Sequence, residues 1–152
     1  IRAMIQQTIV PDIVQQQKIT SVTPDDTVFA AAVKMTETHI AALVVLGEDG
    51  ALVGILTERD VTQRLVAKGF DASATPVSEI MTANPDTLSP DDAAGDALEL
   101  MQSRKYRHLP VTEGGKCVGM VSIRDLYAAV KLALEEDIKE TEAFVFRDPY
   151  GA

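Results

Sequence analysis

Short apolar runs and longer helical stripes alternate along the first half of the chain. Residues 41–46 (AALVVL) and 51–56 (ALVGIL) are apolar runs separated by GEDG, a pattern typical of two buried strands joined by a turn. Ahead of them, Val28, Ala31 and Met35 recur at helical spacing. The pattern therefore predicts a helix followed by two strands.

Capping signals predict where the helices begin and end. Thr23-Pro24 followed by two aspartates is a typical helix start, so we expect the first helix to begin there. Thr57, with Asp60 three residues later, predicts a second helix directly after the second strand. Gly69 suits the C′ position at the end of that helix.

The same pattern occurs a second time along the chain. Residues 22–35 (VTPDDTVFAAAVKM) align with residues 88–101 (LSPDDAAGDALELM). Further on, VGILTERD, which ends at Asp60, aligns with VGMVSIRD, which ends at Asp125. Self-similarity at a fixed period indicates two copies of one structural unit.

The second copy predicts its own set of elements. These are a helix from Ser89 to about Arg104, strands at 108–112 and 116–121, and a final helix capped by Ser122. Short helices are also expected ahead of each copy, at residues 11–15 and 77–81.

Each copy is short enough to bury only a marginal core by itself, and packing two copies together solves that problem. We expect an α+β fold of two pseudo-symmetric repeats, each β-α-β-β-α, packed sheet to sheet. The expected divisions are a first repeat at 11–69, a linker at 70–76, a second repeat at 77–134, and a helix end and tail at 135–152. Phe144, Val145 and Phe146 in the tail are apolar enough to dock, for example on a partner subunit.

Charge and composition narrow the function. The formal net charge of −9 argues against general binding to nucleic acid or to an anionic membrane, because both need a cationic surface. No apolar run approaches the roughly 18 residues of a membrane span, and no segment resembles a signal peptide. The single cysteine, Cys117, fits a reducing compartment. We therefore expect a cytoplasmic protein in which Cys117 is a buried strand residue.

The paired motifs VGILTERD and VGMVSIRD, with the repeated units around them, resemble the tandem CBS domain pair, the cystathionine β-synthase-type or Bateman module. The resemblance runs from about Pro11 to Leu134, with no catalytic domain attached, and looks like a stand-alone bacterial CBS-pair protein. It implies a non-catalytic regulatory module that binds AMP, ADP, ATP, NAD(H) or S-adenosylmethionine between its repeats. No cofactor is required under this hypothesis.

The resemblance also implies a disc-like homodimer and is compatible with an unknown protein partner. The alternative is a ligand-free scaffold that dimerises and acts through protein–protein contacts. An enzyme is disfavoured because no nucleophile, general base or metal cluster accompanies the motifs. His39 and His108 have no Cys, Asp or Glu at a usual metal spacing, so no metal site is expected.

The hydroxyl and carboxylate of each motif are candidate ligand contacts. Thr57 and Ser122 would stand at helix N-termini, where free N–H groups and the helix dipole favour phosphate oxygens. The resemblance implies that Asp60 and Asp125 accept hydrogen bonds from ribose hydroxyls. The competing interpretation is that each pair is a capping box and nothing more.

The two copies differ ahead of the strand that precedes the turn. CBS pairs often place a basic residue there to meet a phosphate, and Arg107 matches, whereas Ala41 stands in the first copy. With Lys105, His108 and Arg124, Arg107 would form a focused anion site on an acidic chain. A solvated helix end is the alternative. We expect two inequivalent sites, with phosphate bound by Arg107.

An adenine ring would need an apolar pocket. Gly54 and Gly119 are expected to help, because a missing Cβ would let the ligand approach the backbone. The residues expected to form the adenine pocket lie on the strands and in the segments ahead of them: Ile19, Thr20, Ile40, Ala42, Ile55, Pro85, Thr87, Tyr106 and Met120.

Overall fold

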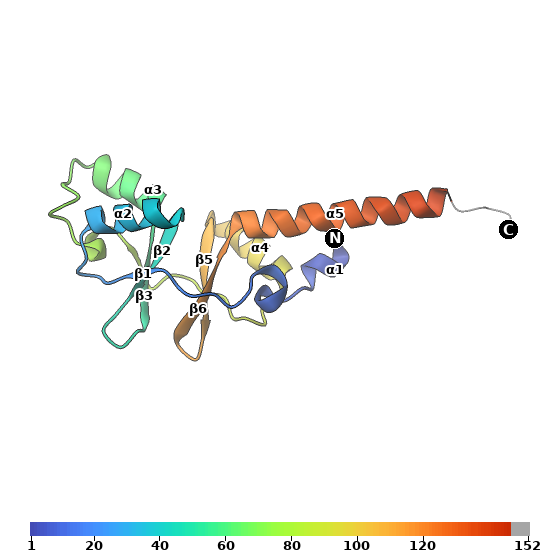
Figure 1. The fold of residues 1–152 in the computed structure, drawn as a ribbon, viewed down its shortest axis with the longest axis horizontal. Helices are drawn as coiled ribbons and strands as arrows, with labels where there is room; N and C mark the ends of the chain where they lie inside the picture. Colours follow the sequence, from blue (N-terminus) through green and yellow to red (C-terminus); the bar gives the residue numbers. More distant parts are fainter. Residues whose placement is uncertain (147–152) are drawn as a thin grey trace.

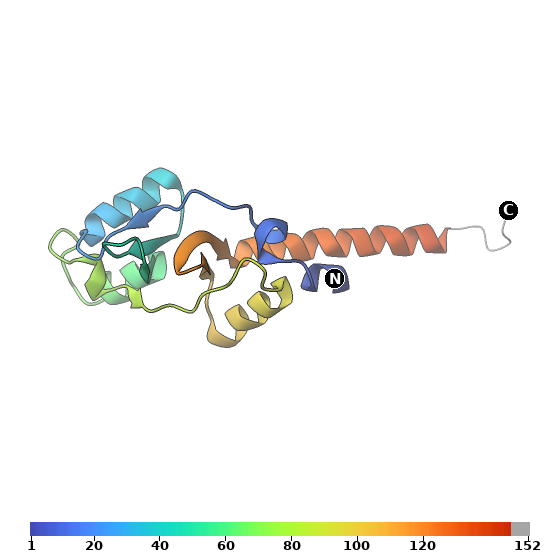
Figure 2. The same ribbon diagram turned by 90° about the horizontal axis from the view of Figure 1, so that it is seen from below.

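The structure is a computed structural model that describes residues 1–146. Figures 1 and 2 show two halves side by side, each containing strands and helices, with one long helix extending from the second half. The two-repeat α+β fold expected from the sequence is confirmed. The first repeat contains β1 (Ser21–Val22), α2 (Val28–Thr38), β2 (Ala42–Leu46), β3 (Leu52–Thr57), α3 (Glu58–Asp60) and the π-helix η2 (Val61–Val66).

The second repeat follows the same plan. It contains α4 (Ala94–Arg104), β5 (His108–Glu113), β6 (Lys116–Ser122) and α5 (Ile123–Val145). Short elements lie ahead of each repeat, namely α1 (Arg2–Ile5) and the π-helix η1 (Ile9–Ile13) before the first, and the 3-10 helix η3 (Val77–Glu79) and β4 (Thr82–Ala83) before the second.

The segment ahead of each repeat packs on the other repeat. Strand β4 precedes the second repeat, yet it pairs antiparallel with β3, so the first sheet has the order β1-β2-β3-β4. In the mirrored position, the N–H of Gln17 donates to the carbonyl oxygen of Val118 at 3.4 Å. This exchange ties the halves together, and the bridge between Ala51 and Lys116 adds a direct contact between the two sheets.

The two hydrophobic cores show the same exchange. In the first core, Val77 and Ile80 from the segment before the second repeat are fully buried with residues of β2, β3 and α2. In the second core, Ile9 and Val14 from the N-terminal segment are buried with residues of α4, β5, β6 and α5. Neither core is therefore built from one repeat alone.

The expected helix starts at Thr23 and Ser89 are wrong. Helix α2 begins later, with Thr27 at its N-cap accepting a hydrogen bond from the N–H of Ala30 at 3.1 Å, and α4 has Ala93 at its N-cap. Residues 23–26 instead form a turn.

These turns receive the exchanged segments. The carbonyl oxygen of Asp26 accepts from the N–H of Val77 at 2.8 Å, and that of Asp92 accepts from the N–H of Ile9 at 2.9 Å. Backbone carbonyls that point at a neighbouring segment in this way hold it in place. The Pro-Asp-Asp sequences therefore dock the crossing segments and do not begin the helices.

The expected first strand of the second repeat is only a single parallel bridge, between Leu88 and Val111. Leu88 donates to the carbonyl oxygen of Pro110 at 2.9 Å and accepts from the N–H of Thr112 at 2.8 Å. Pro110 has no N–H, so it cannot supply the next bond of the ladder. In the first sheet the corresponding position is Val44, and β1 forms a two-residue strand.

The last helix is longer than the repeat pattern predicts. Helix α5 begins at Ile123 and continues to Val145, well past the expected repeat boundary at 134. Phe144, Val145 and Phe146 are 75%, 65% and 85% exposed, so they contact little within a single chain. Their docking on a partner subunit stays a prediction, and residues 147–152 of the expected tail lie outside the described residues.

Candidate ligand-binding cleft

A cavity of about 1250 Å³ lies between the two repeats and is lined by residues of both. Its volume exceeds the roughly 300–1,000 Å³ of an ordinary small-molecule site. Almost every residue singled out from the sequence lines it, namely Ile19, Thr20, Ile40, Ala42, Ile55, Thr57, Asp60, Pro85, Tyr106, Arg107, His108, Met120, Ser122, Arg124 and Asp125. Thr87 does not line it and is exposed in the segment before Leu88.

Both motifs form capping boxes. The N–H of Thr57 donates to Oδ2 of Asp60 at 2.9 Å, and the N–H of Asp60 donates to Oγ1 of Thr57 at 3.2 Å. The corresponding bonds between Ser122 and Asp125 measure 2.8 Å and 3.2 Å. Each box occupies Oδ2 of its aspartate, so Oδ1 is the oxygen left for other partners.

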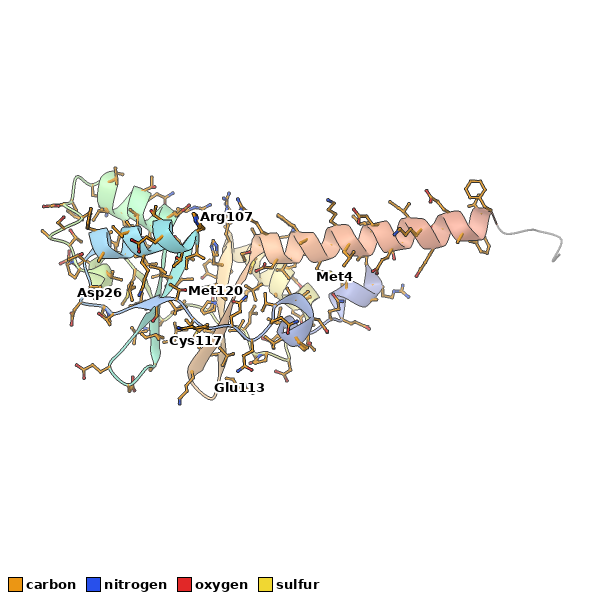
Figure 3. The ribbon with its side chains drawn as sticks, viewed as in Figure 1. Met4, Asp26, Arg107, Glu113, Cys117 and Met120 are labelled. Carbon is orange, nitrogen blue, oxygen red and sulfur yellow. The ribbon has the colours of Figure 1, made fainter. Side chains whose placement is uncertain are left out.

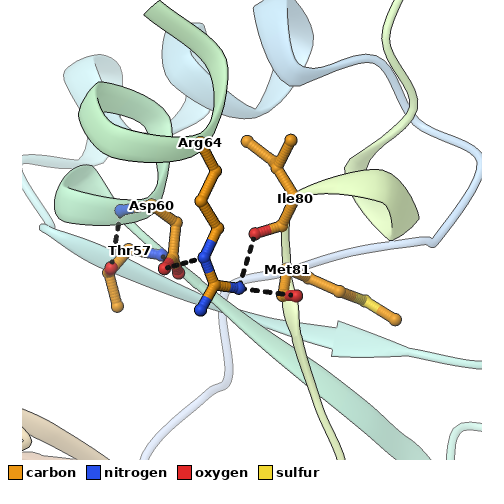
Figure 4. Close-up of polar contacts among 5 residues, drawn as sticks. All are labelled: Thr57, Asp60, Arg64, Ile80 and Met81. Carbon is orange, nitrogen blue, oxygen red and sulfur yellow. Dashed lines mark hydrogen bonds and ion pairs between the residues drawn. The ribbon is translucent and has the colours of Figure 1, made fainter. Parts of the chain in front are cut away.

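The oxygen Oδ1 has different surroundings in the two copies. In the first copy it lies 3.7 Å from Nε of Arg64, which is four residues along the helix (Figure 4). In the second copy the corresponding position is Ala129, and within residues 1–146 no hydrogen bond or ion pair reaches Oδ1 of Asp125. One carboxylate is thus already paired, and the other is open to the cavity.

Arg107 lies where the alignment with Ala41 predicts. The carbonyl oxygen of Arg107 accepts from the N–H of Ile123 at 2.8 Å, and that of Ala41 accepts from the N–H of Glu58 at 3.0 Å. Each carbonyl thus accepts the N–H of the first helical residue, which directly follows the cap. Figure 3 shows Arg107 between the two repeats, and its side chain is exposed to the cavity.

The cavity is cationic although the chain is acidic. Within residues 1–146 its lining includes seven of the chain's 14 lysines and arginines, but four of its 23 aspartates and glutamates. The cations are Lys18, Arg59, Arg64, Arg104, Lys105, Arg107 and Arg124, and the acids are Glu58, Asp60, Asp86 and Asp125. A concave surface with this charge excess attracts anions.

His108 is half-buried at the junction of the two repeats. Burial lowers the pKa of its imidazole, and the nearby Arg107 and Arg124 lower it further, while Asp125 and Glu58 oppose the shift. The side chain is therefore neutral at pH 7 and can accept or donate one hydrogen bond toward the cavity.

The interpretation of the two glycines was wrong. Neither Gly54 nor Gly119 lines the cavity. A Cβ on Gly54 would lie 2.5 Å from Sδ of Met81 and 3.0 Å from the carbonyl oxygen of Thr82, so the missing side chain admits the exchanged segment and not a ligand. A Cβ on Gly119 would meet only Val111, at 3.8 Å.

Cys117 lies on β6 and is half-buried, so the expected strand placement is confirmed but its burial is incomplete. Its Sγ donates to the carbonyl oxygen of Gly119 at 3.4 Å. Burial raises the pKa of the thiol, which keeps it protonated at pH 7.

Arg64 and the ion pair between Arg104 and Asp86 were not found from the sequence. Nη1 of Arg104 lies 3.1 Å from Oδ2 of Asp86, and both residues line the cavity. The spacing of Asp60 and Arg64, four residues apart on a helix, is a signal that could have revealed the first pair. The ion pair between Arg104 and Asp86 depends on the position of the segment between the repeats, and no local pattern specifies that position.

Two further features of the described part of the chain bear on function. Residues 1–146 contain no group of three or more His, Cys, Asp and Glu side chains placed to hold a metal ion. None of the helices described is both long and apolar enough to cross a membrane.

Comparison with known proteins identifies the family. The CBS domain family model matches residues 10–67 and 77–132. The chain is 37% identical over 127 residues to the CBS domain-containing protein CBSX3, mitochondrial, of Arabidopsis thaliana, covering 81% of this chain and 62% of that protein. The chain belongs to the CBS domain family and contains two CBS repeats.

Solved structures of CBS proteins share the fold. The CBS-domain containing protein ATU1752 from Agrobacterium tumefaciens matches with a TM-score of 0.70 and 32% identity, over 74% of this chain and 90% of that chain. The CBS domain protein PAE2072 from Pyrobaculum aerophilum, solved in complex with AMP, matches with a TM-score of 0.69 and 26% identity, over 75% of this chain and 86% of that chain.

The curated relatives extend beyond the region of similarity. The chain spans 62% of the Arabidopsis CBSX3 protein and 23% of another Arabidopsis relative, CBSCBSPB5. Both align with this chain over 127 residues.

Proposed function

We propose that this CBS pair is a regulatory, non-catalytic module that binds an adenosine phosphate in the cleft, with the second repeat supplying the main contacts. The open Oδ1 of Asp125 beside the cations of the second repeat is the observation that carries the proposal. The AMP complex of the related Pyrobaculum protein supports an adenosine ligand.

The chemistry of the second repeat suits each part of such a ligand. Asp125 would accept hydrogen bonds from the ribose hydroxyls through Oδ1, because a carboxylate oxygen can accept more than one. Ser122 lies at the N-terminus of the 23-residue helix α5, where the helix dipole favours phosphate oxygens. Arg107 and Arg124 would add charge-assisted bonds to the same phosphate.

The adenine ring would lie among apolar side chains of both sheets. Met120 lies between the two halves in Figure 3, and Tyr106 lines the cavity on the same repeat. Ile55 and Ala42 line the cavity from the first sheet. A ligand held by both repeats stabilises the arrangement in which both contacts exist, and that preference for one state is the basis of a regulatory signal.

Thermal unfolding with AMP, ADP, ATP, NAD(H) and S-adenosylmethionine tests this function. A ligand present at 100 times its Kd stabilises the protein by about 2.7 kcal/mol. We expect stabilisation by at least one phosphate-bearing adenosyl ligand, and loss of that stabilisation in Asp125→Ala. Asp60→Ala is the matched control, because it removes the same capping box from the first repeat. Stabilisation by none of the ligands, or stabilisation that persists in Asp125→Ala, would refute the proposal.

A second candidate function, a scaffold formed by two copies of the chain, is favoured by an exposed stripe on α5. Tyr127, Leu134, Ile138 and Val145 are 55%, 46%, 56% and 65% exposed. Their spacing of seven, four and seven residues places them on one face of the helix, and that face is apolar. Apolar helix faces of this kind commonly pack against another helix.

The charges beside the stripe fit a second copy of the chain. Arg124 and Lys131 border it near the start of α5, while Glu135 and Glu142 border the same side further along. Two α5 helices that pair in antiparallel orientation would place the basic half of one beside the acidic half of the other. The same surface is then self-complementary, as a twofold interface requires.

Light scattering coupled to size exclusion tests the pairing. We expect a dimer that Leu134→Glu converts to a monomer, while Leu132→Glu, at a 58% exposed position on another face of α5, leaves it dimeric. A monomeric wild type, or a Leu134→Glu variant that remains dimeric, would rule out this interface. A dimer that binds none of the adenosyl ligands would favour the scaffold over the sensor.

A further inference from the structure

We propose that Arg64 closes the first half of the cleft to ribose by occupying Asp60, so that one chain binds one adenosyl ligand. The proposal rests on the proposed function of the cleft. It assigns to Arg64 the role of a specificity-determining residue that blocks the first half-site, here defined as Thr57, Asp60 and the cavity beside them.

The position of Arg64 is fixed by contacts on both sides of its guanidinium. Nε lies 3.7 Å from Oδ1 of Asp60, and Nη1 donates to the carbonyl oxygens of Ile80 at 3.2 Å and Met81 at 3.1 Å (Figure 4). The two carbonyls belong to the segment exchanged from the second repeat. The guanidinium therefore lies between the carboxylate and a segment that the first core holds in place.

The oxygen of Asp60 that the capping box leaves open faces the guanidinium of Arg64. Oδ2 already accepts the N–H of Thr57, and Oδ1 is paired with a cation. The side chain of Asp60 is 12% exposed, so a ribose could reach it only from the cavity side, where Arg64 lies. A neutral ribose hydroxyl forms a weaker bond to a carboxylate than a guanidinium does, so it would not displace Arg64 readily.

The second repeat provides a natural control for this arrangement. Its capping box has the same geometry, but Ala129 replaces arginine four residues after Asp125. The residues that align with Ile80 and Met81 are Val14 and Gln15, and no arginine side chain within residues 1–146 donates to their carbonyl oxygens. At the aspartate itself, the half-sites thus differ chiefly in the Arg64 side chain and its three contacts.

A ligand in the first half-site would break more contacts than the ion pair between Arg64 and Asp60. A ligand that displaces Arg64 also removes its bonds to the carbonyl oxygens of Ile80 and Met81. Ile80 is 1% exposed in the first core, and the adjacent β4 forms the edge strand of the first sheet. Ligand binding at the first half-site would therefore weaken the attachment of the exchanged segment. Ligand binding at the second half-site would break no ion pair of Asp125.

Calorimetric titration with AMP and with adenosine tests the proposal through its stoichiometry. We expect one AMP per chain in wild type and two in Arg64→Ala. The affinity of the newly opened half-site should rise about tenfold, because a ligand there no longer has to break the charge-assisted hydrogen bonds of Arg64 to Ile80 and Met81. In Arg64→Ala combined with Asp60→Ala, the second binding event should disappear. Adenosine should show the same change in stoichiometry, because Arg64 competes with the ribose for the carboxylate of Asp60.

The reciprocal variant Ala129→Arg introduces a guanidinium four residues after Asp125. We expect it to weaken binding to the remaining site at least about tenfold, by the same reasoning. Circular dichroism and thermal unfolding without ligand establish that each variant folds, and the Arg64→Ala result decides the proposal if Ala129→Arg does not fold.

The outcomes separate this proposal from the proposed function. One AMP per chain in both wild type and Arg64→Ala would overturn the role of Arg64 and leave the adenosyl function intact. Weaker binding in Arg64→Ala would show that Arg64 contacts the ligand itself, and would also overturn the proposal. Binding by Arg64→Ala with none by wild type would support the blocking role and refute ligand binding at the second repeat.

Discussion

The two halves of the cleft share one local structure but surround it with different side chains. Each has a strand, a capping box and a helix, with nearly identical hydrogen bonds between hydroxyl, carboxylate and backbone. The residues around the boxes differ: Arg64 and Ala41 on the first half, Ala129 and Arg107 on the second. The shared residues build the fold, and we propose that the unshared ones decide what each half can bind.

Under the proposed role of Arg64, a repeat would lose a binding surface without losing its structure. A capping box contributes to stability whether or not a ligand uses the same carboxylate, by about 0.5–2 kcal/mol for the cap. The first half-site retains that contribution, while Oδ1 of Asp60, which the box does not use, is paired with Arg64. The presence of the motif in a sequence therefore establishes the helix start and leaves the ligand undetermined.

The two sheets should differ most in how they tolerate a side chain at Gly54 and at Gly119. Gly54→Ala should destabilise the protein by about 1–3 kcal/mol, because the new Cβ overlaps Met81 and the backbone of Thr82. Gly119→Ala is the matched change in the second sheet. The new Cβ has room there, so the free energy of unfolding of this variant should be unchanged or up to about 1 kcal/mol higher. Urea unfolding of both variants measures the difference, and equal stabilities would contradict the close packing at Gly54.

The next effect concerns the phosphate. Arg107→Ala should weaken AMP binding by about five- to tenfold, because an exposed guanidinium contributes less to a phosphate contact than a buried one. Adenosine, which lacks the phosphate, should bind equally to the variant and to wild type. The loss should also shrink at high salt, because exposed charges are screened. Titrations at two salt concentrations measure it, and an equal loss for adenosine would show that Arg107 does not act on the phosphate.

The smallest effect is a pH dependence of stability from His108, whose counterpart in the first half is Ala42. The pKa of His108 is lowered in the folded protein, chiefly by burial, so the unfolded chain binds more protons below about pH 6.5. Stability from this group is therefore complete above pH 6.5 and is lost as the pH falls toward the lowered pKa. Urea unfolding between pH 5 and pH 8 should show this slope, and His108→Gln should flatten it. An unchanged slope in His108→Gln would contradict the assignment.

Sequence comparison predicted much of the fold because the repeat places equivalent residues at equivalent positions. The alignment of Arg107 with Ala41 is matched by equivalent backbone hydrogen bonds to the two helices. The boxes at Thr57 and Ser122 were predicted as caps, and both are caps. These features depend on residues close together in the chain, and local patterns specify them well.

The features that were missed depend on contacts between distant segments. The Pro-Asp-Asp turns look like helix starts in isolation, but their carbonyls bind residues of the exchanged segments. Gly54 looks like an opening for a ligand until Met81 fills the space. Arg64 has its second set of partners at Ile80 and Met81, which come from the other repeat. The sequence of one repeat contains no signal for such contacts.

A crystal structure of the protein grown with AMP tests the central claim most directly. We expect AMP on the second repeat, with the ribose hydroxyls on Oδ1 of Asp125, the phosphate beside Arg107, and Arg64 still paired with Asp60. An AMP whose ribose binds Asp60, with Arg64 displaced from Ile80 and Met81, would contradict the claim that the two halves differ in this way. A cleft without AMP at saturating concentration would contradict the adenosyl function itself.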